Sequence, residues 1–229
     1  MEILNTPQCV GFIMDGNRRW AKAQGLKTFD GHAKGYEVLQ ELITAVHAAN
    51  IPHMVCYAFS TENWKRTEDE VGYLMNLLKH AFSEFRKKRK TDTRRINIRV
   101  IGERERLSPV LQDEISFIEE QNYDDPELTV WIAFSYGGRA EIVDAVNRAY
   151  LSGQKITEES FGSFLWTKDM PDPDLVIRTS GEERLSNFLL WQTAYSELFF
   201  TKTLWPDFGE SEFQSILEQY TNRKRRIGK

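Results

Sequence analysis

The segment Val10-Gly-Phe-Ile-Met14 is followed at once by Asp15-Gly-Asn-Arg-Arg-Trp20, so a short apolar run leads into a polar, basic one. A run of this length that ends in polar residues and glycine is typical of a buried strand. Similar runs recur along the chain at 54–59, 96–101, 128–134, 174–177 and 197–200. Segments with helical spacing separate them, at 32–50, 68–90, 108–122, 140–151, 157–168 and 210–223. This alternation predicts an α/β fold with a mainly parallel central sheet of about six strands, flanked by helices.

Composition limits the class of protein. The chain has 229 residues, of which 41% are hydrophobic and 28% charged, and no repeat or linker divides it. We therefore expect a single domain over residues 1–229. A net charge of −4 argues against a nucleic-acid partner. The two cysteines form no Cys-x-x-Cys pair, and no signal peptide or membrane span is evident, so a cytoplasmic location is expected.

Polar, arginine-rich segments follow four of the predicted strands. In an open parallel sheet, ligands bind beyond the carboxyl ends of the strands. The arginines expected on this rim are Arg18, Arg19, Arg66, Arg139, Arg178 and Arg184. Their forked donors suit phosphate oxygens, and Gly16 lets the backbone approach an anion at the start of the next helix. Asp15 stands among these cations, and Mg²⁺ favours one or two carboxylates together with substrate phosphates. The rim therefore predicts a diphosphate site with Mg²⁺.

Each of these residues also has a plain structural interpretation. Asp15 could cap a helix, His32 could be a core or capping histidine, and Trp20 and Trp64 could serve packing. Arg178 and Arg184 could pair with neighbouring glutamates. Convergence at one sheet edge favours a single anionic ligand over several unrelated explanations. The basic stretch 86–99 is interpreted as a solvated helix end, with a contact to anionic lipid headgroups as the alternative.

An ordered set of motifs runs through the chain: Met14-Asp-Gly-Asn-Arg-Arg-Trp-Ala21, Gly31-His32-x-x-Gly35, Tyr57-Ala-Phe-Ser-Thr-Glu-Asn-Trp-Lys-Arg66, Tyr136-Gly-Gly-Arg139, Asp174-Leu-Val-Ile-Arg-Thr179, Arg184-Leu-Ser-Asn-Phe-Leu-Leu-Trp191 and Leu204-Trp-Pro-Asp-Phe208. Over essentially its whole length the sequence resembles the cis-prenyltransferases, the family of undecaprenyl diphosphate synthase. Members condense isopentenyl diphosphate with an allylic diphosphate, such as farnesyl or geranyl diphosphate, in successive cis additions that require Mg²⁺.

The resemblance implies roles for individual residues. Asp15 would handle Mg²⁺ and the allylic diphosphate, Glu197 would be a second metal-linked acid, and Asn63 matches the residue proposed to take up the proton. Arg178, Arg184 and Ser186 would hold isopentenyl diphosphate. The complete substrate-binding set that we predict is Gly16, Asn17, Arg18, Arg19, Trp20, Thr28, His32, Ser60, Thr61, Glu62, Trp64, Arg66, Arg178, Arg184, Leu185 and Ser186.

A growing prenyl chain needs an apolar tunnel, because each buried methylene contributes about 0.8 kcal/mol. The helical face from Val71 to Phe85, opposite Ala58 and strand 128–134, is the candidate wall. Trp131 and Phe134 are bulky, and either one would shorten the product if it pointed into the tunnel.

The C-terminal Arg226 and Gly228 match a family pattern that reaches the partner's site in a homodimer. The expected product is a polyprenyl diphosphate, namely undecaprenyl diphosphate, the precursor of the lipid carrier for cell-wall glycans. A cytoplasmic enzyme with such a product could associate with the inner face of the membrane. A non-catalytic partner subunit and an unrelated phosphate-ester enzyme on an α/β sheet are the alternatives.

Overall fold

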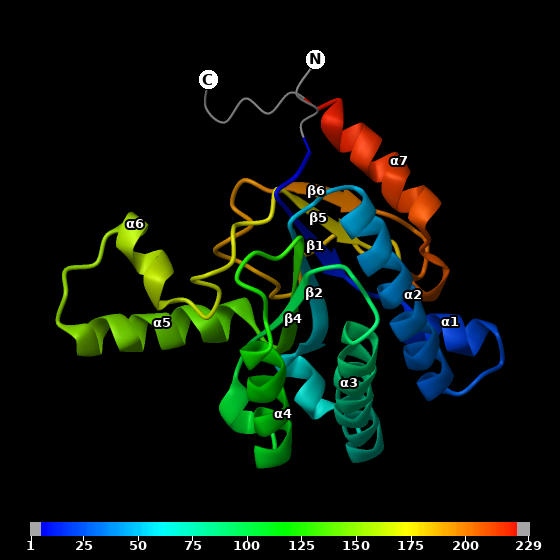
Figure 1. The fold of residues 1–229 in the computed structure, drawn as a ribbon, viewed down its shortest axis with the longest axis horizontal. Helices are drawn as coiled ribbons and strands as arrows, with labels where there is room; N and C mark the ends of the chain where they lie inside the picture. The colour runs from blue at the N-terminus through cyan, green and yellow to red at the C-terminus, as the bar shows by residue number, and fades with distance from the viewer. Residues whose placement is uncertain (1–5, 224–229) are drawn as a thin grey trace.

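Six strands form one sheet in the order β3-β4-β2-β1-β5-β6, and every pairing is parallel (Figure 1). The computed structural model describes residues 6–223. The strands are β1 (Cys9–Ile13), β2 (His53–Ser60), β3 (Ile96–Ile101), β4 (Leu128–Tyr136), β5 (Leu175–Arg178) and β6 (Glu197–Phe200). The α/β class predicted from the sequence is confirmed, and the sheet is wholly rather than mainly parallel. β4 lies inside the sheet and is buried at all nine positions, which explains its near-continuous apolar sequence.

Helices connect the strands at nearly all the predicted places. They are α1 (Asn17–Ala23), α2 (Thr28–Ala48), α3 (Glu68–Arg89), α4 (Pro109–Glu120), α5 (Gly138–Ser152), α6 (Glu158–Phe161) and α7 (Glu210–Thr221). The helix predicted over 157–168 is wrong in length, because α6 ends at Phe161 and only a short 3₁₀ turn follows. One physical reason is that the backbone N–H of Thr167 donates to the Glu141 carboxylate at 3.1 Å, where a helix would need a carbonyl. Within residues 6–223, no helix is both long enough and apolar enough to cross a membrane.

Alternate residues of the strands face two separate apolar clusters. On β4, Ile132 and Phe134 join the larger cluster, which packs against α2, α3, α4 and α7. Trp131 faces the smaller cluster on the other side of the sheet, where its indole N–H lies 3.3 Å from His53 Nδ1. A buried side chain of this size stabilises the fold by about 1.5–3 kcal/mol.

Two glycines bring α1 against α2 and so shape the edge of the sheet. Gly16 has a φ of 118°, a backbone conformation that residues with a Cβ rarely adopt. A Cβ on Gly31 would lie 2.2 Å from the carbonyl oxygen of Asn17, which no real side chain tolerates. The close approach that results places Asn17 and His32 on the wall of one cavity.

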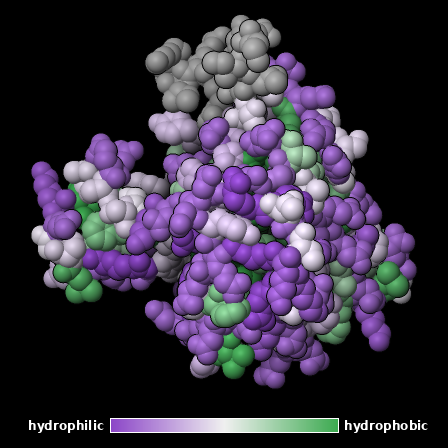
Figure 2. Space-filling view, viewed as in Figure 1, coloured by the Kyte–Doolittle hydropathy of each residue, from purple (hydrophilic) through white to green (hydrophobic). Residues whose placement is uncertain are grey.

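The helices α5 and α6 extend away from the body of the molecule as an arm (Figure 1). Ala145, Phe161 and Leu165 form the small core of this arm. Its outer surface carries hydrophobic side chains, and Figure 2 shows hydrophobic atoms there on a face that is otherwise largely hydrophilic. Val143 and Tyr150 of α5 are 62% and 84% exposed, and Val146 between them is 51% exposed. At helical spacing these three residues form an exposed apolar stripe along α5, on a different face from the buried Ala145 and Ala149.

Acidic neighbours offset much of the basic stretch 86–99. Three ion pairs show this: Arg86 with Glu114 at 3.1 Å, Lys87 with Glu84 at 2.9 Å, and Arg94 with Asp92 at 2.6 Å. Exposed ion pairs of this kind contribute little to stability but neutralise the surface field. The structure therefore favours a solvated helix end over a lipid-binding patch for this stretch.

Candidate active site

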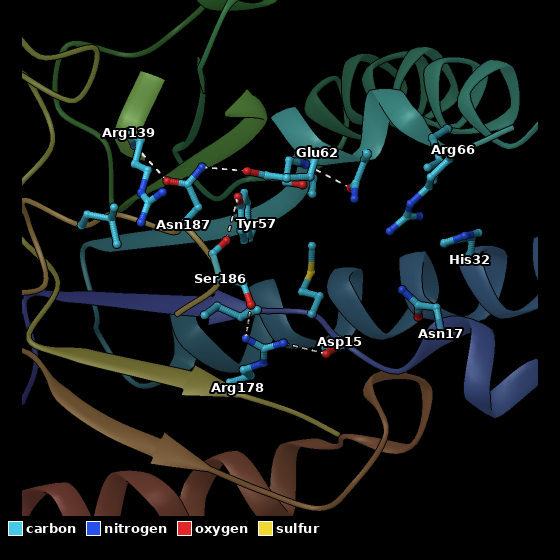
Figure 3. A pocket seen from close by; sticks show the side chains of 17 residues that line it. Asp15, Asn17, His32, Tyr57, Glu62, Arg66, Arg139, Arg178, Ser186 and Asn187 are labelled. Carbon is cyan, nitrogen blue, oxygen red and sulfur yellow. Dashed lines mark hydrogen bonds and ion pairs between the residues drawn. The ribbon is translucent and has the colours of Figure 1, made fainter. Parts of the chain in front are cut away.

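The carboxyl ends of β1, β2, β4 and β5 meet around a cavity of about 570 Å³ (Figure 3), and a second cavity of about 850 Å³ adjoins it. Both cavities are lined by Met14, Asp15, Asn17, His32 and Arg66. The sheet edge therefore holds a charged chamber where the sequence places the diphosphate site.

Asp15 is fixed between two guanidinium groups. Its carboxylate lies 2.9 Å from Nη2 of Arg178 and 3.4 Å from Nη2 of Arg19. Burial by itself raises the pKa of Asp15, but hydrogen bonds from Arg178 and Ser180 and the charges of the two arginines outweigh it. The pKa therefore lies below its ordinary value, and Asp15 is ionised at neutral pH. It is a fixed carboxylate with a guanidinium group on either side.

Arg178 links Asp15 to the segment that follows β5. It is only 4% exposed, and its Nη1 donates to Ser186 Oγ at 2.7 Å and to the carbonyl oxygen of Arg184. Its Nε is buried and has no hydrogen-bond partner within residues 6–223. A buried guanidinium with a free donor, beside a cavity, suits an anionic ligand.

A second charged group lies across the chamber around Glu70 of α3. Glu70 is 6% exposed and accepts from Arg66 at 2.8 Å, and His32 Nε2 lies 3.2 Å from the same oxygen. Burial lowers the pKa of His32 and outweighs the opposing effect of Glu70, while the Arg66 charge lowers it further. His32 is therefore neutral at pH 7. Glu70 was not among the predicted site residues; it lies on the first turn of α3, four residues after Arg66, which precedes the helix.

The 3₁₀ turn η1 (Thr61–Lys65) covers the chamber from the β2 side. Asn63 Oδ1 accepts from the backbone N–H of Ser60 at 3.1 Å, which fixes the side chain at the cavity wall. Glu62 accepts from Asn187 at 2.9 Å and so joins this turn to the segment after β5 (Figure 3). Trp64 donates to Ser135 Oγ at 2.9 Å and lies under the guanidinium of Arg106, 4.9 Å from the ring centre.

Most of the predicted site residues line the two cavities. They are Asp15, Gly16, Asn17, Arg18, Arg19, Thr28, His32, Ser60, Glu62, Asn63, Arg66, Arg178 and Ser186. Arg139, which the sequence placed on the rim, also lines the wall, as does Asn187, which was not in the predicted binding set.

Other predicted site residues lie outside these walls. Trp20 donates to Asp207 at 2.7 Å, and Arg184 pairs with Glu182 at 2.5 Å. Thr61, Trp64 and Leu185 are also absent from the lining residues of the two cavities.

Glu197, the second predicted metal ligand, does not lie beside Asp15 of the same chain. Glu197 begins β6, opposite Leu175, whereas Asp15 follows the end of β1, where Ile13 is opposite Arg178. Its carboxylate pairs instead with Arg223 at 2.5 Å. Arg226 and Gly228 lie outside the described residues.

Apolar cavities continue from the chamber between α2, α3 and the sheet. One of about 100 Å³ shares Met14, Asn17, His32, Ala58 and Leu74 with the chamber and is also lined by Leu39, Leu78 and Phe134. A second of about 130 Å³ adjoins it and reaches Phe85 and Ile96. These cavities follow the predicted wall, and Phe134 contributes to them while Trp131 does not.

Comparisons with known proteins agree with this arrangement. The family model of putative undecaprenyl diphosphate synthase matches residues 13–228. An isoprenyl transferase of Fusobacterium nucleatum is 48% identical over 98% of this chain and 96% of its own length. The structure of lavandulyl diphosphate synthase from Lavandula x intermedia, in complex with dimethylallyl diphosphate, superposes with a TM-score of 0.93 at 35% identity, covering 98% of this chain and 99% of that one. A probable undecaprenyl diphosphate synthase from Campylobacter jejuni gives a TM-score of 0.83 at 34% identity, covering 98% of this chain and all of that one.

The fold, the charged chamber and the apolar cavities behind it, together with these matches, define a prenyltransferase. More particularly, the chain belongs to the undecaprenyl diphosphate synthase family, whose close relatives are named isoprenyl transferases.

Proposed function

We propose that this enzyme condenses isopentenyl diphosphate with farnesyl or geranyl diphosphate in successive cis additions, and that its product is undecaprenyl diphosphate for cell-wall glycan carriers. The observation that carries the proposal is the position of Asp15. It lies between two guanidinium groups in a charged chamber whose wall residues Met14 and Asn17 also line the first apolar cavity. A diphosphate head and a hydrocarbon tail would each meet matching surroundings there.

The donor set at Asp15 fits Mg²⁺. Among residues 6–223 no group of three or more acidic, histidine or cysteine side chains could hold a metal alone. Mg²⁺ commonly binds through one carboxylate plus substrate phosphates, so Asp15 would supply the protein ligand and the diphosphate the others. When bound, the ion would neutralise charge that develops on the leaving diphosphate.

The other residues of the chamber would stabilise the leaving group, bind the second substrate and accept the proton. As the allylic C–O bond breaks, Arg18, Arg66 and neutral His32 would stabilise the departing diphosphate by fixed charges and hydrogen bonds. Arg178 and Ser186 would hold isopentenyl diphosphate so that its double bond attacks the allylic carbon. The proton lost from the new chain would pass to Asn63 or to a diphosphate oxygen.

A homodimer is part of the proposal. The exposed stripe of Val143, Val146 and Tyr150 on the α5 arm supports it, because contiguous apolar surface of this kind marks protein interfaces. In such a dimer Arg226 and Gly228 would reach the partner's site. Deleting residues 224–229 is expected to raise the KM for isopentenyl diphosphate, whereas Val146→Glu is expected to give a monomer in analytical ultracentrifugation. An unchanged KM after the deletion would refute the role of the C-terminus.

Incubation with radiolabelled isopentenyl diphosphate and farnesyl diphosphate, with and without Mg²⁺, tests the function. We expect Mg²⁺-dependent incorporation into long, butanol-extractable products, and chromatography gives their length. Absence of incorporation would favour a non-catalytic partner subunit. Release of free phosphate without chain growth would favour a phosphate-ester enzyme.

A further inference from the structure

A glutamate on the first turn of α7 holds the segment that follows β6. Glu212 is half-buried, and its Oε1 accepts from the hydroxyl groups of Thr201 at 2.5 Å and of Thr203 at 3.2 Å. The backbone N–H of Thr203 donates in turn to Thr201 Oγ1 at 3.2 Å. Because hydrogen bonds to an ionised acceptor are stronger than those between neutral groups, Glu212 is the main acceptor of this network.

An acidic residue at the start of a helix usually has another role. A carboxylate in the first turn interacts favourably with the free N–H groups of the helix itself. Glu210, exposed in the same turn, can supply that interaction. Glu212 differs because two side chains from another segment converge on one of its oxygens. A polar network of this kind fixes the relative positions of the segments that it joins, here α7 and the segment after β6.

The segment held by Glu212 supports the turn that follows β5. The carbonyl oxygen of Thr203 accepts from Ser180 N–H, and that of Thr201 accepts from Gly181 N–H, both at 2.7 Å. Ser180 and Gly181 have positive φ angles, of 82° and 77°. A serine keeps this conformation only where its surroundings enforce it. The two backbone bonds therefore hold the turn in a shape that it would otherwise lose.

The same segment lies directly behind Asp15. The backbone N–H of Trp205 donates to the carbonyl oxygen of Asp15 at 3.0 Å. Leu204 fills the space beside Gly16, since a Cβ on that glycine would lie 3.0 Å from Cδ2 of Leu204. The backbone that presents the Asp15 carboxylate to the chamber thus rests on residues that follow Thr203 at once.

Arg19 connects the two supported turns. Its guanidinium donates to the carbonyl oxygen and the hydroxyl of Ser180, at 3.1 and 2.5 Å, and lies 3.4 Å from the carboxylate of Asp15. Both partners of Arg19 contact the segment that Glu212 holds. A shift of that segment would therefore displace Asp15 and Arg19 together.

We propose that Glu212 is a positioning residue for the allylic diphosphate, acting through the segment after β6 on Asp15 and Arg19. This inference rests on the proposed function, which places the allylic diphosphate at Asp15 and isopentenyl diphosphate at Arg178 and Ser186. Arg178 has a separate support, because its Nη1 donates to Ser186 Oγ at 2.7 Å. Loss of the Glu212 network should therefore affect the two substrates unequally, which a general loss of stability would not do.

The variant Glu212→Ala tests this, with Glu212→Gln as its matched rescue. Alanine removes the acceptor for both threonine hydroxyls, whereas the amide oxygen of glutamine can still accept from them. We expect Glu212→Ala to raise the KM for the allylic substrate about tenfold, while the KM for isopentenyl diphosphate stays at the wild-type value. Glu212→Gln should resemble the wild type in both constants. Glu218→Ala, exposed in the last turn of α7, is the control and should change neither.

Three results would overturn the proposal. They are equal rises in both KM values, an unchanged allylic KM in a folded Glu212→Ala protein, and a Glu212→Gln protein as impaired as Glu212→Ala. If Glu212→Ala does not fold, Thr201→Val provides the test from the other side of the network. It keeps the branched shape but lacks the hydroxyl that donates to Glu212, so the allylic KM alone should rise.

Calorimetric titration with inorganic pyrophosphate and Mg²⁺ measures binding without turnover, and it separates this inference from the proposed function. We expect Glu212→Ala to bind pyrophosphate about tenfold more weakly than the wild type does. A wild-type protein that binds pyrophosphate but extends no prenyl chain refutes the proposed function alone. Equal affinity in the wild type, Glu212→Ala and Thr201→Val refutes the role of Glu212.

Discussion

Nη2 of Arg178 lies 2.9 Å from Oδ2 of Asp15, although 163 residues separate the two in the sequence. The contact follows from the topology, since β1 and β5 are parallel neighbours and Ile13 is opposite Arg178. Because Arg178 is almost fully buried, its charge requires a partner inside the molecule. Asp15 is that partner, and it also faces the chamber where a metal and a diphosphate would bind.

We expect Asp15→Asn to lower kcat by about 100-fold or more, because a neutral amide would be a weaker ligand for the proposed Mg²⁺ and cannot balance the charges of the chamber. The fold should survive, since an amide oxygen still accepts a hydrogen bond from Arg178. Steady-state kinetics at saturating levels of both substrates measure the effect. Asp169→Asn, at an exposed position outside the chamber, is the control. A kcat equal to that of the control would contradict a catalytic role for Asp15.

The buried His32 gives stability a pH dependence. Its ordinary pKa is 6.5, and burial lowers that pKa in the folded protein. As pH falls through 6.5, unfolded chains therefore take up a proton that folded chains resist, and the free energy of unfolding falls. His32→Gln should remove this component. Urea unfolding of both proteins between pH 8 and pH 5 should show the wild type losing more stability than the variant, and parallel curves would argue against the lowered pKa.

Local patterns were sufficient to predict the strands, most helices and the rim of the site. The apolar runs end where the polar loops begin, so parallel pairing brings Asp15, Ser60 and Arg178 to one edge. Glu70 was missed because a glutamate on a helix usually faces water. Only the packing of α3 against His32 shows that this carboxylate is buried.

Strand register explains the difference at Glu197. The sequence shows that a strand contains this residue, but not which end of the strand is closer to the chamber. In the fold, Phe200 rather than Glu197 is level with Arg178. A residue at the start of a parallel strand lies one strand length away from the sheet edge that the carboxyl ends form. A motif match gives no information about this distance.

Removing the Glu70 carboxylate should affect both stability and binding. Glu70→Gln removes the counter-charge of Arg66 and changes the hydrogen-bond partner of the neutral His32, which we expect to cost about 1–3 kcal/mol of unfolding free energy. Arg18, 3.9 Å away, is largely exposed and contributes less. The KM for the allylic substrate should rise because the guanidinium of Arg66 is no longer held in place. Glu68→Gln, exposed on the same helix, provides the control, and identical unfolding curves for the two variants would refute the role of Glu70.

Phe134 and Trp131 provide a matched test of product length, because they lie three residues apart on β4 and face opposite sides of the sheet. Phe134 lines the apolar cavity next to the chamber, and Phe134→Ala should open it and give longer prenyl chains. Trp131→Ala should leave the chain length as it is, since Trp131 packs against His53 away from that cavity. Both substitutions are expected to cost about 3–5 kcal/mol of stability, so length differences cannot come from destabilisation alone. Chromatography of the extracted products decides the matter: the same length distribution from Phe134→Ala as from wild type would mean that the growing tail takes a path that does not pass Phe134.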